Sequence, residues 1–133
     1  MTKLLVIEDE DSLRDSIADL LEAEGYEVLQ AENGLTGVQL AGKHLPDLII
    51  CDVMMPVSDG YDVLNKLRSM ATTADIPLIF LTARAESPAG LGSGRGSTGY
   101  LRKPFTRAAL LAIVQTRLEQ RAAASGSGII DRA

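Results

Sequence analysis

The chain has 133 residues, a formal net charge of −5 and a pI near 4.8, a length that suits one domain with a sizeable core. The acidic balance argues against direct nucleic-acid binding, which requires a basic face. No apolar run approaches membrane-spanning length, and one cysteine cannot form an internal disulfide. We therefore expect a soluble domain of the reducing cytoplasm that contacts neither DNA nor membrane.

Short apolar runs alternate with amphipathic segments along the chain. Asp11 or Ser12 is expected to cap a first helix that Gly25 ends, and a second helix is expected from about Leu35 to Lys43. A third helix is expected to start at Asp59, and Thr106 is expected to cap the last one. The expected strands are Lys3–Ile7, Tyr26–Ala31, Leu48–Cys51, Ile76–Leu81 and a short one around Tyr100–Arg102. This alternation predicts an α/β fold, with a parallel sheet covered by helices on both faces.

Polar side chains follow four of these strands where each one ends. Glu8 and Asp9 follow the first strand, Asp52 the third, Thr82 the fourth and Lys103 the fifth. Open parallel sheets bind their ligands at the carboxyl ends of the strands. Three carboxylates, a hydroxyl and an ammonium group are therefore expected to converge on one small site.

The same strand ends carry motifs that together resemble a known family. The motifs are Ile7-Glu8-Asp9-Glu10, Asp52-Val53-Met54-Met55-Pro56, Asp59-Gly60, Leu81-Thr82-Ala83 and Tyr100-Leu101-Arg102-Lys103-Pro104-Phe105. Their order is similar to that of the receiver domain of two-component response regulators, over roughly residues 1 to 120. The resemblance implies a flavodoxin-like doubly wound sheet with strand order 2-1-3-4-5. We expect the domain to span residues 1–121.

The resemblance also implies the chemistry of the site. Asp52 would accept a phosphoryl group from a phosphohistidine of a histidine kinase, and Mg2+ would be the cofactor. Two like charges about 5 Å apart repel by roughly 3 kcal/mol at an effective dielectric of about 20, so clustered carboxylates require a cation or a proton. The expected metal ligands are Glu8, Asp9, Asp52 and the backbone carbonyl of Met54. Without the other motifs, Glu8 and Asp9 would be interpreted as solvated charges at a helix start.

Five further positions take roles from the same resemblance. Lys103 and Thr82 would neutralise and hydrogen-bond the phosphoryl oxygens, and Pro104 would follow a cis peptide bond. Tyr100 would be a switch aromatic that moves inward as Thr82 shifts. Arg84 and the side chain of Met54 would modulate loss of the phosphoryl group. Alternatively, Lys103 is an exposed strand-end lysine, and Thr82 and Tyr100 are ordinary strand residues.

One segment departs from the pattern of the family. Where the fourth helix is expected, residues 87–99 are rich in glycine and serine. Each glycine costs a helix roughly 1 kcal/mol relative to alanine, so we expect this helix to be missing or unwound. The Ser125-Gly126-Ser127-Gly128 stretch predicts that residues 122–133 form a flexible tail or linker remnant.

These observations leave more than one function open. The leading hypothesis is a phosphorylation-controlled conformational switch, with a histidine kinase as phosphodonor and a downstream effector as partner. Such a domain accepts a phosphoryl group and then catalyses its own dephosphorylation, so it is not a turnover enzyme. The alternative is an engineered or degenerate receiver scaffold that keeps the Mg2+ pocket but has impaired output or altered oligomerisation. A phosphohydrolase is disfavoured because Met54 stands where those enzymes usually carry a second Asp. A flavin-binding relative is disfavoured because Glu8-Asp9-Glu10-Asp11 would repel phosphate.

Overall fold

The computed structural model describes residues 1–55, 59–83 and 98–130, with side chains to residue 122. The described chain contains, in order, β1 (Lys3–Ile7), α1 (Asp11–Ala23), β2 (Glu27–Ala31), α2 (Gly34–His44), β3 (Leu48–Asp52), α3 (Gly60–Arg68), β4 (Leu78–Thr82), β5 (Thr98–Arg102) and α4 (Arg107–Ile130). The label α4 belongs here to the last helix. The predicted loss of the family's fourth helix concerns residues 87–99, which lie almost entirely outside the described ranges. Arg84 also lies outside these ranges.

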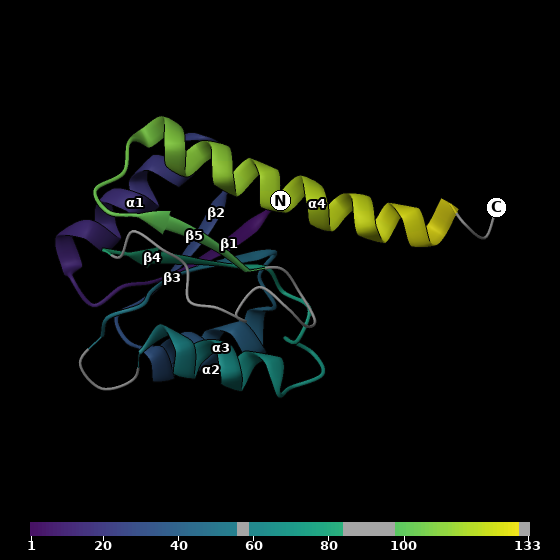
Figure 1. Ribbon diagram of the computed structural model, residues 1–133, viewed down its shortest axis with the longest axis horizontal. Coiled ribbons are helices and arrows are strands. Elements are labelled where there is room, and N and C mark those ends of the chain that lie inside the picture. Colours follow the sequence, from purple (N-terminus) through teal and green to yellow (C-terminus); the bar gives the residue numbers. More distant parts are fainter. Residues whose placement is uncertain (56–58, 84–97, 131–133) are drawn as a thin grey trace.

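All five strands pair in parallel in the order β2-β1-β3-β4-β5. The helices α2 and α3 cover one face of this sheet, and α1 and α4 cover the other (Figure 1). The α/β fold and the strand order expected from the sequence are thus confirmed. No helix in the described part of the chain is both long and apolar enough to cross a membrane.

The alternation of side chains along each strand divides the core into two layers. Along β3, for example, Ile49 and Cys51 face the α2–α3 side, and Leu48 and Ile50 face the α1–α4 side. The strands β1, β3 and β4 are buried on both faces, in agreement with their nearly continuous apolar runs. Burial on both faces makes the central strands a rigid base for the residues that follow them.

The helix starts follow the sequence at three of four places. The side chains of Asn33, Asp59 and Thr106 accept hydrogen bonds from backbone N–H groups in the first turns of α2, α3 and α4. The expected cap of α1 at Asp11 or Ser12 was wrong: Glu10 is the capping residue, and it makes no side-chain cap. Gly25 follows α1 with a φ of +93°, a conformation that glycine adopts without strain.

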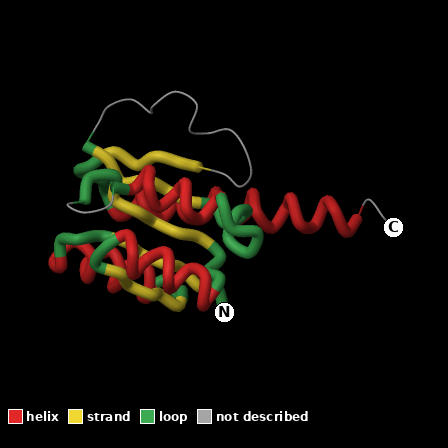
Figure 2. Tube along the Cα trace, turned by 90° about the horizontal axis from the view of Figure 1, so that it is seen from below, coloured by secondary structure: helices red, strands yellow, loops and turns green. Residues whose placement is uncertain are grey.

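The last helix is longer than the sequence predicted. The backbone of α4 stays helical through Ser125-Gly126-Ser127-Gly128 to Ile130, and its end projects beyond the sheet (Figures 1 and 2). A run of alanines at residues 122–124 favours continuation of the helix before the glycines are reached. The fifth strand is also longer at its start, since Thr98 and Gly99 belong to β5 and not to the irregular segment expected there.

Candidate functional site

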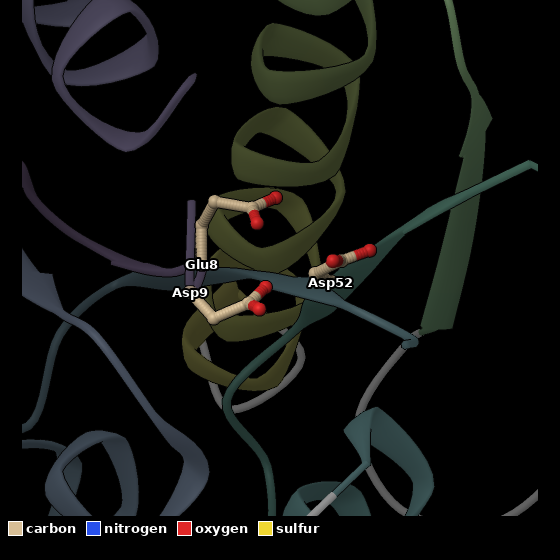
Figure 3. A group of neighbouring side chains, drawn as sticks. All are labelled: Glu8, Asp9 and Asp52. Atoms are coloured by element: carbon tan, nitrogen blue, oxygen red, sulfur yellow. The ribbon is translucent and has the colours of Figure 1, made fainter. Parts of the chain in front are cut away.

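Three carboxylates gather at the carboxyl ends of two neighbouring strands (Figure 3). Glu8 follows β1 and Asp52 ends β3, and the pairing of Ile7 with Cys51 places these strand ends side by side. The carboxylate oxygens of Glu8, Asp9 and Asp52 lie within 4.8 Å of one another. Glu8 is 1% exposed and Asp52 5%, whereas Asp9 is exposed to solvent.

The ammonium group of Lys103, which directly follows β5, completes this cluster. Its Nζ lies 3.1 Å from Oδ1 of Asp52 and 3.4 Å from Oε1 of Glu8. The backbone N–H of Lys103 donates to the carbonyl of Thr82 at 2.7 Å, which fixes the end of β5 against the end of β4. The peptide bond between Lys103 and Pro104 is cis, the geometry that the resemblance implied.

The protonation of Glu8 is strongly affected by its surroundings. Burial raises the pKa of this carboxyl from the usual 4.5 to about 7, and the charge of Asp52 adds to the increase. The backbone N–H of Glu10, which donates to Oε2 at 3.1 Å, and the charge of Lys103 act in the opposite direction. One ammonium group therefore does not balance all of the negative charge in the cluster.

Two neighbouring groups respond to the same charges. Burial alone would lower the pKa of Lys103, but its hydrogen bond to Asp52 and the charges of Asp52 and Glu8 outweigh burial and raise it. The pKa of the Cys51 thiol is raised well above its usual value by burial first and then by the charge of Asp52. Lys103 thus remains a cation and Cys51 an uncharged core residue, as expected for a small buried hydrophobe.

Of the remaining predicted site residues, the structure describes Thr82, Tyr100 and Met54. Thr82 is buried at the end of β4, beside β3. Tyr100 lies on β5 with its ring packed against the α2–α3 core layer. The side chain of Met54 is 70% exposed in the loop after β3. Arg84 lies outside the described residues.

Sequence reasoning missed Arg14, which supports the loop that carries the acidic residues. Its guanidinium donates to the backbone carbonyl of Glu8 at 2.9 Å and to Oδ1 of Asp11 at 2.7 Å. Only the spacing of Asp11 and Arg14, one helical turn apart, pointed to a contact. The bond to the carbonyl of Glu8 depends on how the loop folds back over the helix start.

The donor set fits a small hard cation. All the side-chain groups of the cluster that could ligate a metal are carboxylate oxygens, the donors that Mg2+ prefers. Oxygens on opposite sides of Mg2+ lie about 4 Å apart, so oxygens within 4.8 Å of one another need only small shifts to share one ion. A cation would also offset the charge of Asp52, which adds to the effect of burial in raising the pKa of Glu8.

Comparison with known proteins agrees with this geometry. Residues 4–115 match the family described as the response regulator receiver domain. The chain belongs to this family. Receiver domains bind Mg2+ at an acidic pocket and work with histidine kinases; here Glu8, Asp9 and Asp52 form the acidic pocket.

Two curated relatives are similar over most of the chain. The probable transcriptional regulator ycf29 of Porphyra purpurea is 41% identical over 84% of this chain and 54% of its own length. The DNA-binding dual master transcriptional regulator RpaA of Synechocystis is 39% identical over 90% of this chain and 50% of its own. The chain therefore spans about half the length of these relatives.

Solved structures share the fold at comparable identity. The chemotaxis protein CheY4 of Vibrio cholerae superposes with a TM-score of 0.79 at 35% identity, covering 87% of this chain and 98% of that one. The receiver domain of the sensor histidine kinase PA1611 of Pseudomonas aeruginosa superposes with a TM-score of 0.78 at 32% identity, covering 89% of this chain and 98% of that chain. That structure is described as having a magnesium ion coordinated in its active site cleft.

Proposed function

We propose that this receiver domain accepts a phosphoryl group on Asp52 from a phosphohistidine of a histidine kinase, with Mg2+ as cofactor. The observation that carries the proposal is the position of Asp52, a nearly buried carboxylate held between the Lys103 ammonium and two further carboxylates. Burial removes water that would compete for the phosphorus, and the donor would approach from the side of Asp9, which is exposed to solvent.

The reaction is a transfer of one phosphoryl group between two nucleophiles. One carboxylate oxygen of Asp52 forms a bond to phosphorus while the bond from phosphorus to the imidazole nitrogen of the donor breaks. The electron pair of that bond stays on the imidazole, which takes up a proton. The product is a mixed anhydride on Asp52. Water later attacks the phosphorus of this anhydride, which restores the carboxylate and releases phosphate.

The protein contributes positioning and charge balance to this step. Lys103 already contacts Asp52 and would neutralise one phosphoryl oxygen, and the hydroxyl of Thr82 would donate to another. Glu8, Asp9, Asp52 and the backbone carbonyl of Met54 would hold Mg2+. When bound, Mg2+ supplies positive charge that offsets the negative charge of the carboxylates and the phosphoryl oxygens.

Phosphorylation would then change the affinity for a downstream effector, either a protein or a further domain. Supporting this role, the two curated relatives above are named transcriptional regulators and are about twice as long as this chain. We place the protein in the cytoplasm, where a histidine kinase exposes its phosphorylated histidine. The acidic net charge favours a protein partner over direct contact with DNA.

Intact mass spectrometry after incubation with Mg2+ and a small phosphodonor tests this proposal. Phosphoramidate is suitable because its P–N bond resembles that of phosphohistidine. We expect a mass gain of one phosphoryl group in the wild type and in Asp19→Asn, an exposed aspartate on α1. We expect no gain in Asp52→Asn or with EDTA, and a rate roughly 100-fold lower in Lys103→Met.

A phosphoryl group that persists in Asp52→Asn would refute the assignment of the acceptor. Hydrogen exchange on the same samples separates the switch from the scaffold alternative. Changed protection in β5 and α4 on phosphorylation indicates a working switch. Changes confined to the strand ends indicate an acceptor without output.

A further inference from the structure

Arg14 contacts the backbone of the candidate metal site from a place where its own helix does not favour an arginine. It is the fourth residue of α1, close to the helix N-terminus, where the helix dipole disfavours a cation. Its side chain is only 14% exposed, so most of it has left water. The contacts that Arg14 makes must therefore offset an unfavourable position.

Two acceptors share the guanidinium of Arg14, and they differ in strength. Nη2 lies 2.7 Å from Oδ1 of Asp11, but the side chain of Asp11 is 78% exposed, so this ion pair contributes little to stability. Nη1 donates to the backbone carbonyl of Glu8 at 2.9 Å, in a partly buried place where a charged donor forms a stronger bond. The contact with Glu8 is therefore the one that explains Arg14.

The carbonyl of Glu8 belongs to the peptide that joins Glu8 to Asp9, the two acidic residues that follow β1. On the other side of Glu8, its backbone N–H donates to the carbonyl of Ala31, the last residue of β2, at 3.0 Å. Both backbone groups of Glu8 are thus held, and because a peptide is planar, the start of Asp9 is held with them. Asp9 is exposed, so the direction of its carboxylate toward those of Glu8 and Asp52 (Figure 3) depends on this peptide.

Arg14 affects a bound cation in two opposite ways. Its positive charge repels Mg2+, and by this effect alone removal of the arginine would tighten binding. Its bond to the Glu8 carbonyl holds the ligands in place before the ion arrives, which lowers the entropy that binding costs. Removal of a group that orients metal ligands typically lowers metal affinity roughly 10- to 100-fold. Because the two effects have opposite signs, a substitution shows which of them dominates.

We propose that Arg14 is a positioning residue of the candidate metal site, and that its hold on the peptide between Glu8 and Asp9 strengthens Mg2+ binding despite its positive charge. The inference rests on the proposed function for the identity of the cation. Arg14 acts through the backbone of Glu8 and is not itself a ligand, because a guanidinium has no acceptor atom. Lysine has the same charge, but its single ammonium lacks the fork that reaches two acceptors.

Titration of the unphosphorylated chain with MgCl2, followed by amide chemical shifts in NMR, measures the dissociation constant of Mg2+. We expect Arg14→Met to raise this constant roughly tenfold and Arg14→Lys to raise it by a smaller factor. If only the charge of Arg14 mattered, Arg14→Met would lower the constant and Arg14→Lys would leave it unchanged. Binding to Arg14→Met that is as tight as to the wild type, or tighter, would overturn the inference.

Two control variants separate the contact with Glu8 from the rest of the arginine. Asp11→Asn removes the exposed ion pair and keeps the contact with the Glu8 carbonyl, and Arg107→Met removes an arginine from an exposed pair on α4. Both should bind Mg2+ within about threefold of the wild type. A loss in Asp11→Asn equal to that in Arg14→Met would overturn the inference. Circular dichroism verifies folding, and Arg14→Gln replaces Arg14→Met if that variant does not fold.

Amide exchange in EDTA provides a second readout that requires no metal. The backbone N–H of Glu10 donates to Oε2 of Glu8 at 3.1 Å, so its exchange with water reports how firmly the turn is held. We expect this exchange to be roughly tenfold faster in Arg14→Met, the factor that corresponds to loss of one charged hydrogen bond, and that of Leu21 in α1 to be unchanged. Equal exchange of Glu10 in both proteins would overturn the inference. A wild type that binds Mg2+ but gains no phosphoryl group would refute the proposed function alone, and one that binds no Mg2+ would refute both.

Discussion

The charge of Glu8 depends on its burial, on the neighbouring carboxylate and on whether a cation is bound. It is almost fully buried, lies beside Asp52 and shares a single nearby ammonium group with it. Burial and the neighbouring carboxylate raise its pKa to about 7, so at neutral pH about half of the metal-free molecules keep a proton that an exposed glutamate would have lost. Proton and cation are therefore alternative ways of balancing the same charge.

The stability of the metal-free domain should fall as the pH rises from about 4.5 to about 7. Across this window the folded protein retains the Glu8 proton and the unfolded chain has lost it, so each step up in pH favours unfolding. The loss reaches at most roughly 3 kcal/mol. Urea unfolding in EDTA at pH 5, 6, 7 and 8 measures it, and Glu8→Gln should be more stable than the wild type at pH 8.

Glu22→Gln provides the control for this comparison, because Glu22 is an exposed glutamate on α1. It should follow the pH dependence of the wild type. Identical pH profiles for Glu8→Gln and the wild type would contradict the role assigned to Glu8.

At the scale of one element, α2 shows how a helix approaches the sheet. Gly37 is buried, and a Cβ atom there would overlap the side chain of Ile7, which itself has no exposed surface. Gly42, on the same helix, is exposed, and a Cβ atom there would meet nothing within 4 Å. The first glycine allows close packing beside the strand that leads to Glu8, and the second has no such role.

The same substitution should have opposite effects at these two positions. Gly37→Ala should lower the free energy of unfolding by roughly 1–3 kcal/mol, because Ile7 is β-branched and enclosed and cannot move aside. Gly42→Ala should raise it by roughly 0.5–1 kcal/mol, the difference in helix propensity. Urea unfolding monitored by circular dichroism measures both, and two changes of the same sign would refute the packing argument.

At the scale of the whole molecule, the last helix closes the α1–α4 face and then leaves the sheet (Figure 1). Its residues Leu110 and Val114 are buried in the core layer of this face. Near the end of its packed part, Arg121 donates to the backbone carbonyls of Asp47 at 2.7 Å and Pro46 at 3.3 Å. We propose that this anchor ends the folded domain; the part of α4 beyond it, residues 122–130, projects past the sheet.

Removal of Arg121 should loosen α4, whereas removal of a second arginine on the same helix should not. Arg121→Ala should cost about 1–2 kcal/mol, because two carbonyls lose a charged donor. Arg107→Ala removes only an exposed pair with Glu24 and should cost under about 0.5 kcal/mol. Hydrogen exchange should show amide protection falling beyond Arg121 in the wild type and earlier in Arg121→Ala. Equal protection along α4 in both variants would contradict the anchor.

Much of the fold could be predicted because local patterns and global architecture agree. The apolar runs, the caps at Asp59 and Thr106 and the glycine after α1 all act within a few residues. The cap of α1 and the end of α4 were predicted wrongly, because capping and helix length at these places depend on backbone geometry and on competing local preferences. The strand order came from the resemblance, since periodicity carries no information on which strands pair.

For the candidate site, the chain alone predicts which chemical groups stand at the strand ends: Glu8, Asp9, Asp52, Thr82 and Lys103. It could do so because a parallel sheet brings all carboxyl ends to one edge. No sequence pattern predicts the contacts of Lys103 with two carboxylates, the raised pKa of Glu8 or the ring contacts of Phe80 with Tyr61 and Tyr100. Burial and distances between remote residues arise only when strands and helices pack, and they control charge and ring contacts more strongly than any local pattern.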